Sequence, residues 1–192
     1  MDNDVSAGSA TSTSVLGHLA LGLTLLAFGI GHTGAIKGVT AGDAVTLALY
    51  VGGIALFVAG LLAYRAGELF SGSAFAALGA FWFTWGIGAG HQVTADAVGF
   101  FLILWALLAL SLTLGAASSG PLVQGTYALF GVGLVLLAIG QFADSTGIIK
   151  VGGWFAVLAG LASWYAATAA LANWPVALPG HRAAGRGVTA TG

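Results

Sequence analysis

Residues 51–82 read VGGIALFVAGLLAYRAGELFSGSAFAALGAFW, two apolar runs separated by a short charged turn. Arg65 and Glu68 are the only charged residues in this stretch. Because a charged side chain is costly to place in hydrocarbon, both are expected where water begins, at the junction of two membrane-spanning helices. The stretch therefore predicts a helical hairpin that crosses a bilayer twice.

The composition of the 192-residue chain indicates the same class, because 58% of its residues are hydrophobic and only 6% are charged. Soluble domains carry about 25% charged residues, so an all-α integral membrane protein is predicted. A net charge of −1 argues against nucleic acid as a partner. The absence of cysteine from the sequence excludes disulfides and Cys-ligated metals.

A spanning helix needs roughly 20 apolar residues, and this length divides the chain into a bundle of six transmembrane helices. The predicted spans are residues 15–34, 44–64, 71–90, 97–117, 121–142 and 148–172.

The six spans form one predicted membrane domain, residues 15–173, between an N-terminal tail, residues 1–14, and a C-terminal tail, residues 174–192. The first tail contains Asp2 and Asp4 but no Lys or Arg, so the positive region of a cleaved signal peptide is missing. The first span is therefore expected to be a retained helix.

Six crossings place both termini on one side of the membrane, together with the second and fourth loops. That side carries Arg65, Arg182 and Arg186, against Lys37 and Lys150 on the other. Cytoplasmic loops usually hold the excess of Lys and Arg. We expect a multi-pass protein of the cell membrane with both termini in the cytoplasm.

Glycines recur every seven residues on the third span, at Gly72, Gly79 and Gly86. Small residues on one face let helix backbones approach closely in a bilayer. This seam is expected against a neighbouring helix, within the subunit in preference to between subunits.

One face of the first span has polar groups at both ends and apolar groups between them. His18, Leu21, Leu25, Phe28 and His32 follow the spacing that shares a helical face, with the two imidazoles about 21 Å apart. This profile is typical of a channel wall, and an ionisable group within a span is a functional candidate that titrates near neutrality. The alternative for each histidine is a hydrogen bond to a nearby carbonyl or interfacial water.

The stretch around the hairpin resembles the acetate uptake transporter family, which includes the bacterial succinate–acetate permeases. Their second and third helices carry a pattern close to YGGIAQ-(I/F)-FAGLLEYKKGNTFG-TAF-YGSFW. The residues in step with that pattern are Tyr50, Gly52, Gly53, Ile54, Ala55, Ala59, Gly60, Leu61, Leu62, Tyr64, Gly67, Phe70, Ala74, Phe75, Gly79, Phe81 and Trp82. The resemblance implies a channel or transporter for acetate and similar small carboxylates, succinate among them. It also implies a homo-hexameric ring with a pore in each subunit, and it leaves proton coupling open.

In the permeases, apolar or aromatic side chains from helices one, three and five meet as a constriction in the pore. Carried over position by position, these are Leu21, Leu78 and Phe130. Counted from the predicted helix starts at about 1.5 Å per residue, their depths agree within about 5 Å. Leu21 and Leu78 replace aromatic residues of the family, which predicts a looser or differently shaped constriction. Ordinary core packing would explain the same residues.

Further polar candidates are Thr24 on the first span and Tyr127 and Gln141, which bracket Phe130 on the fifth. An uncharged hydroxyl or amide can donate to a carboxylate and replace part of its lost hydration. For Gln141, which stands where the family usually has Asn, a hydrogen bond to a backbone carbonyl is the alternative. The expected substrate pathway comprises His18, Thr24, Phe28, His32, Tyr127 and Gln141.

The chain departs from the family at its first helix, where the signature NPxPLGL is eroded to STSVLGH at residues 12–18. Leu16 and Gly17 remain, the Asn and both prolines are lost, and His18 stands where Leu is usual. Ala63 replaces the Glu of GLLEYKKG. Because the eroded segment lies at the pore entrance in the family, the preferred substrate does not follow from the resemblance.

Two other functions stay open. A channel for small neutral solutes such as urea, amides or ammonia would suit a pore without a fixed cation, and a non-transporting membrane scaffold or sensor would need no pore. No catalytic residue, cofactor or metal is predicted, because the sequence shows no nucleophile–base pair, no spaced ligand cluster and no phosphate-binding loop.

Overall fold

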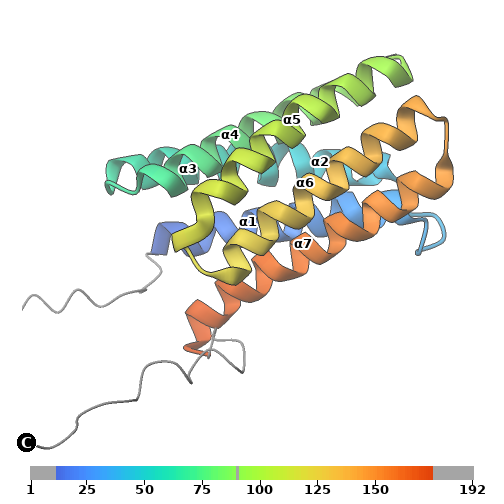
Figure 1. The fold of residues 1–192 in the computed structure, drawn as a ribbon. Coiled ribbons are helices and arrows are strands. Elements are labelled where there is room, and N and C mark those ends of the chain that lie inside the picture. Colours follow the sequence, from blue (N-terminus) through green and yellow to red (C-terminus); the bar gives the residue numbers. More distant parts are fainter. Residues whose placement is uncertain (1–11, 90, 175–192) are drawn as a thin grey trace, which may run out of the picture.

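The computed structural model describes residues 12–89 and 91–174. Within these ranges the chain forms helices and short connections, and the long helices lie side by side as a bundle (Figure 1). The elements are α1 (Ser12–Thr33), η1 (Ala41–Ala44), α2 (Val45–Leu47), η2 (Ala48–Ala55), α3 (Leu56–Arg65), α4 (Leu69–Gly88), α5 (Ala95–Gly115), η3 (Ala116–Ser118), α6 (Pro121–Phe142) and α7 (Thr146–Ala172). The predicted all-α class is confirmed.

The predicted hairpin is also confirmed. The α3 helix ends at Arg65, and α4 begins directly after Glu68. Between them Gly67 has φ +81°, a left-handed conformation that glycine adopts without the strain of a Cβ atom. Arg65 is exposed at this turn, as expected for a charge at the edge of the bilayer.

The second crossing is not a uniform α-helix, which the sequence did not predict. It begins as the 3₁₀ segment η1, continues through α2 and passes into the π-helical segment η2 before α3 completes it. Such π-helical turns interrupt α-helices locally and are frequent at functional sites. In η2, a Cβ on Gly52 would lie 2.7 Å from Cγ of Trp82, so α4 fits closely against this segment.

Five segments are long and apolar enough to cross a membrane: Ser14–Thr33, Ala41–Arg65, Ala95–Ser118, Pro121–Phe142 and Thr146–Ala172. The remaining predicted span, residues 71–90, coincides with α4, which has 20 residues but is not among the five. Its Gly, Ser and Trp residues lower its hydropathy, while its length matches the other spans. The α4 helix lies beside α3 and α5 within the bundle (Figure 1).

Glycine allows the closest helix contacts. The backbones of α1 and α7 touch, because a Cβ on Gly29 would lie 2.6 Å from the backbone nitrogen of Val157. On α4, a Cβ on Gly79 would lie 2.8 Å from Cα of Phe57 in α3. The heptad seam of α4 therefore contacts the second crossing of the same chain, as predicted. In lipid the hydrophobic effect does not drive helices together, and close van der Waals packing at glycines of this kind favours their association instead.

Candidate functional site

Aromatic contacts join the facing sides of α1 and α4 along their length. Near the start of both helices, the ring centroids of His18 and Phe75 are 5.1 Å apart with an interplanar angle of 86°. Farther along, the ring of Phe28 lies 5.2 Å from that of Trp82 and 5.1 Å from that of Trp85. Since the contacts follow the same order on both helices, α1 and α4 run in the same direction.

The α6 helix closes the third side. The rings of Phe70 in α4 and Tyr127 in α6 are 6.0 Å apart. Phe130, one turn beyond Tyr127 on α6, lies 5.6 Å from Phe81 and is stacked on Trp82 at 5.9 Å. We call the region between the facing sides of α1, α4 and α6 the axis. The axis is lined by side chains, because the backbones of α1, α4 and α6 are not in close contact with one another.

The three residues expected at a constriction are all buried on the axis. The exposed fractions are 0% for Leu21, 1% for Leu78 and 2% for Phe130, and the three side chains belong to a single buried cluster. Leu21 and Leu78 each follow a member of the His18–Phe75 ring pair by three residues, so they lie about one turn farther along their helices. Phe130 contacts Phe81 and Trp82, about one turn beyond Leu78 on α4, so side chains fill this stretch of the axis.

The two histidines of α1 lie on the predicted face. Each also makes the hydrogen bond to a nearby backbone carbonyl that was the alternative to a role in a channel wall. Nδ1 of His18 is 2.9 Å from the carbonyl oxygen of Ser14, and Nδ1 of His32 is 2.7 Å from that of Phe28. Since a carbonyl oxygen only accepts, Nδ1 carries the hydrogen in both neutral rings. The Nε2 atoms of these neutral rings are then hydrogen-bond acceptors, which cannot donate to a carboxylate.

Thr24 and Gln141 differ from the other expected pathway residues. The hydroxyl of Thr24 is fully buried and donates to the carbonyl oxygen of Ala20 at 2.7 Å, so its hydrogen is engaged within α1. Its methyl group packs toward Gly52 of the second crossing. Gln141 is half-buried at the end of α6, about three turns beyond Phe130.

Three buried polar atoms on the axis have no hydrogen-bond partner among the described residues: Nε2 of His18, Nε1 of Trp82 and the hydroxyl oxygen of Tyr127. They come one from each of the three helices. Leaving a buried donor or acceptor unpaired costs about 1–3 kcal/mol, and most such groups in proteins are paired. Three along one path are therefore candidates for groups that a solute satisfies as it passes.

Trp82 is a candidate pathway residue that the sequence analysis does not include. It was matched to the family pattern but not placed on the pathway. The signal was present in the helical spacing of Phe75, Leu78, Trp82 and Trp85, the same repeat that identified the face of α1.

The charged side chains of the described residues lie away from the axis, at helix ends and loops. They are Lys37, Asp43, Arg65, Glu68, Asp96, Asp144 and Lys150. No group of three or more His, Asp or Glu side chains with the spacing of a metal site occurs in the part of the chain that the structure describes. The axis therefore offers a solute apolar surface and neutral polar groups.

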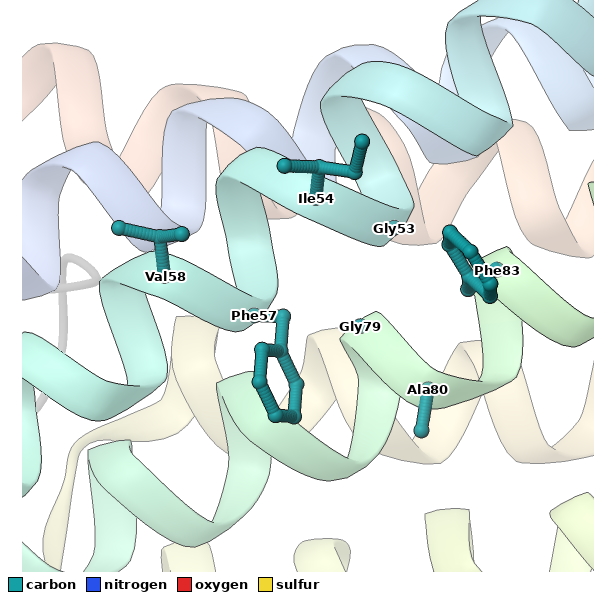
Figure 2. A pocket seen from close by; sticks show the side chains of 7 residues that line it. All are labelled: Gly53, Ile54, Phe57, Val58, Gly79, Ala80 and Phe83. Carbon is teal, nitrogen blue, oxygen red and sulfur yellow. The ribbon is translucent and has the colours of Figure 1, made fainter.

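A hollow of about 330 Å³ lies on the outer side of the hairpin, away from the axis. Figure 2 shows its walls, with Ile54, Phe57 and Val58 on the second crossing and Ala80 and Phe83 on α4. The lining is apolar throughout, and these large side chains are 42–46% exposed. With no donor for a carboxylate, this hollow is suited to a lipid chain or a neighbouring apolar surface.

Comparison with known proteins gives a consistent assignment. The sequence profile described as the GPR1/FUN34/yaaH family matches residues 4–177. The chain is 29% identical over 157 residues to the succinate-acetate/proton symporter SatP of Escherichia coli strain K12, an alignment that covers 77% of this chain and 81% of the symporter. It is 27% identical over 150 residues to ammonia transport outward protein 2 of Saccharomyces cerevisiae, covering 66% of this chain and 53% of the yeast protein.

The fold has a match among solved structures as well. The structure of the bacterial acetate channel SatP superposes with a TM-score of 0.77 and 28% sequence identity. The match covers 85% of this chain and 93% of the channel chain.

Proposed function

Because this chain belongs to the GPR1/FUN34/yaaH family, we propose that it is a membrane channel or transporter for small monocarboxylates, with acetate as its main substrate. The family resemblance seen in residues 50–82 is confirmed, and the five candidate spans identify a multi-pass membrane protein. The observation that carries the proposal is the axis of α1, α4 and α6, where unpaired polar atoms lie along an otherwise apolar path. The fold that holds this axis is similar to that of a bacterial acetate channel.

In this proposal Leu21, Leu78 and Phe130 form the narrowest part of the path. Moving a bare carboxylate into a dry, low-dielectric region costs several kcal/mol even after the protein relaxes. The N–H of Trp82 and the O–H of Tyr127 are free to donate to it, and both lie beside Phe130 or one turn from it. A narrow ring of apolar side chains then admits a solute only when it is small.

The expected hexamer and the orientation of the termini belong to the same proposal. We infer that each subunit has its own path, since all three helices of the axis come from one chain. The exposed apolar hollow at Phe57 and Phe83 supports a neighbouring subunit or lipid against this face. Three arginines on the side of the termini against two lysines opposite support cytoplasmic termini in the cell membrane.

The direct test is uptake of labelled acetate into liposomes that contain the purified protein. We expect uptake well above that of protein-free liposomes, which account for acetic acid that crosses the lipid unaided. Uptake should rise when a proton gradient is imposed, and labelled urea should be excluded. Equal permeability to urea without a response to pH would overturn the acetate proposal. Uptake of neither solute would favour the scaffold or sensor.

A channel for neutral solutes is the second candidate. One relative is named as an ammonia transport protein, and the axis holds no charged side chain among the described residues. The same liposomes, loaded with a pH-sensitive dye and exposed to an ammonium gradient, measure ammonia entry as alkalinisation. No enzymatic role is proposed, since the named relatives are a symporter, a channel and a transport protein.

A further inference from the structure

We propose that His18 and the small pocket beside it form a binding site for the protonated, uncharged form of a small carboxylic acid. The site lies at the end of the axis where α1 begins and α7 ends. The inference builds on the proposed function, because it identifies which form of the substrate is bound before the constriction and by which residue.

The pocket has a volume of about 60 Å³ and lies between the first turns of α1 and α6 and the end of α7. A single water needs roughly 10–15 Å³ on this measure, so the pocket has room for about four waters, as many as acetic acid has non-hydrogen atoms. Its lining residues are Ser14, Val15, His18, Val123, Ala166, Ala167 and Ala170.

The imidazole of His18 is the one aromatic, titratable group in this lining. The residue is 7% exposed, and its Nδ1 donates to the carbonyl oxygen of Ser14 at 2.9 Å. Nε2 of the neutral ring is therefore a lone-pair acceptor. It is buried and has no partner among the described residues.

No side chain among the described residues donates to Nε2 of His18 in the structure, although Ser14 in the same lining carries a hydroxyl. From α4, Phe75 presents its ring at 5.1 Å. From α7, the hydroxyl of Ser163 already donates to the backbone oxygen of His18 at 2.9 Å. From α6, Val123 lines the pocket and is apolar. These contacts include no charged side chain and, besides His18 itself, no titratable one.

The chemistry of this acceptor selects between the two forms of the substrate. A carboxylate has only acceptor oxygens and cannot pair with a bare lone pair. A carboxylic acid has an O–H that donates to Nε2 once the side chains that close this atom off from solvent in the structure give way. When the proton moves to Nε2, the acid O–H bond breaks and an N–H bond forms, which leaves an imidazolium beside a carboxylate. The proton returns to the oxygen as the solute leaves, so no co-reactant is needed.

His18 lies on the path immediately before the apolar constriction, where the uncharged form of the acid is the form that passes more easily. Leu21 follows it by one turn on α1, and Leu78 follows its ring partner Phe75 by one turn on α4. A solute that reaches the apolar constriction from this pocket therefore meets His18 first.

The binding test uses nitrogen NMR of the full chain in lipid nanodiscs, with histidine labelled by ¹⁵N and the His18 signals assigned by their loss in His18→Gln. At a constant pH near 5, we expect acetic acid to move the ¹⁵N chemical shift of His18 Nε2 away from the value of a nitrogen without a hydrogen. Methanesulfonate at the same concentration stays anionic and should cause no shift. An equal shift with methanesulfonate, or no shift with acetic acid, would overturn the inference.

The transport test compares two variants in liposomes. His18→Leu removes the acceptor and should raise the Michaelis constant for acetic acid about tenfold with a smaller change in maximal rate, whereas His18→Gln keeps an acceptor oxygen and should lie between. The control is His91→Gln, an exposed histidine whose Nδ1 also pairs with a carbonyl four residues earlier. It should behave as wild type.

The two proposals fail in different ways. If the wild-type protein carries no acetate, the proposed function fails, while the NMR shift still decides whether His18 binds the acid. If acetate uptake is normal, an unchanged Michaelis constant in His18→Leu overturns only the role of His18.

Discussion

Phe130→Ala is expected to raise acetate uptake about tenfold, which corresponds to a barrier about 1.4 kcal/mol lower. The ring of Phe130 is stacked on Trp82 at 5.9 Å and meets Phe81 at 5.6 Å, so it fills the axis from the side of α6. Its removal leaves a void where the path is proposed to be narrowest. Longer acids such as butyrate should then enter liposomes that exclude them when the wild-type protein is present.

Removing a buried Phe side chain also costs about 3–5 kcal/mol of stability in soluble proteins, so folding must be measured alongside flux. Phe130→Leu removes less volume and should give a smaller increase. The matched control is Phe100→Ala on α5, where the ring is 62% exposed on the outer face. Wild-type uptake and wild-type size selection by a folded Phe130→Ala protein would show that Phe130 is ordinary core packing.

Tyr127→Phe is expected to reduce acetate uptake about tenfold without reducing stability. The side chain is 1% exposed, and its hydroxyl has no hydrogen-bond partner in the described part of the chain. An unpaired buried hydroxyl costs about 1–3 kcal/mol, so replacing it by hydrogen should leave the melting temperature unchanged or raise it. If the hydroxyl donates to the passing substrate, the same change removes a contact from the path.

This prediction separates a transport role from a structural one. Tyr165→Phe on α7 makes the same chemical change at a residue that is 36% exposed, and it should leave both uptake and stability unchanged. A fall in the melting temperature of Tyr127→Phe would indicate that the hydroxyl supports the fold. Full uptake in a stable variant would remove Tyr127 from the path.

The sequence predicted the helices well where polarity changes abruptly. The charged turn at Arg65 and Glu68 located the boundary between α3 and α4, and Pro121 is the first residue of α6, where its missing N–H costs nothing. The spacing of His18, Leu21 and Phe28 identified the buried face of α1 because helical periodicity is a local property.

Features that depend on tertiary contact were not predictable in this way. The π-helical segment η2 has an ordinary apolar sequence, and its close fit through Gly52 against Thr24 and Trp82 is seen only in the structure. The roles of Nδ1 and Nε2 in His18 follow from a hydrogen bond to Ser14 that the sequence does not show. Trp82 was visible by spacing, but the absence of a partner for its N–H was not.

The central claim is that the substrate passes between α1, α4 and α6, and chemical modification at Leu78 tests it most directly. The sequence contains no cysteine, so Leu78→Cys introduces a single thiol on the axis and Leu107→Cys introduces one on α5, where the side chain is 59% exposed. Both variants are treated with the uncharged reagent benzyl methanethiosulfonate, and mass spectrometry measures the extent of modification.

We predict that modified Leu78→Cys takes up acetate no faster than protein-free liposomes, that acetate slows its modification, and that fully modified Leu107→Cys transports as wild type. Wild-type acetate uptake by fully modified Leu78→Cys, or a thiol at residue 78 that never reacts while transport continues, would contradict a path between these three helices.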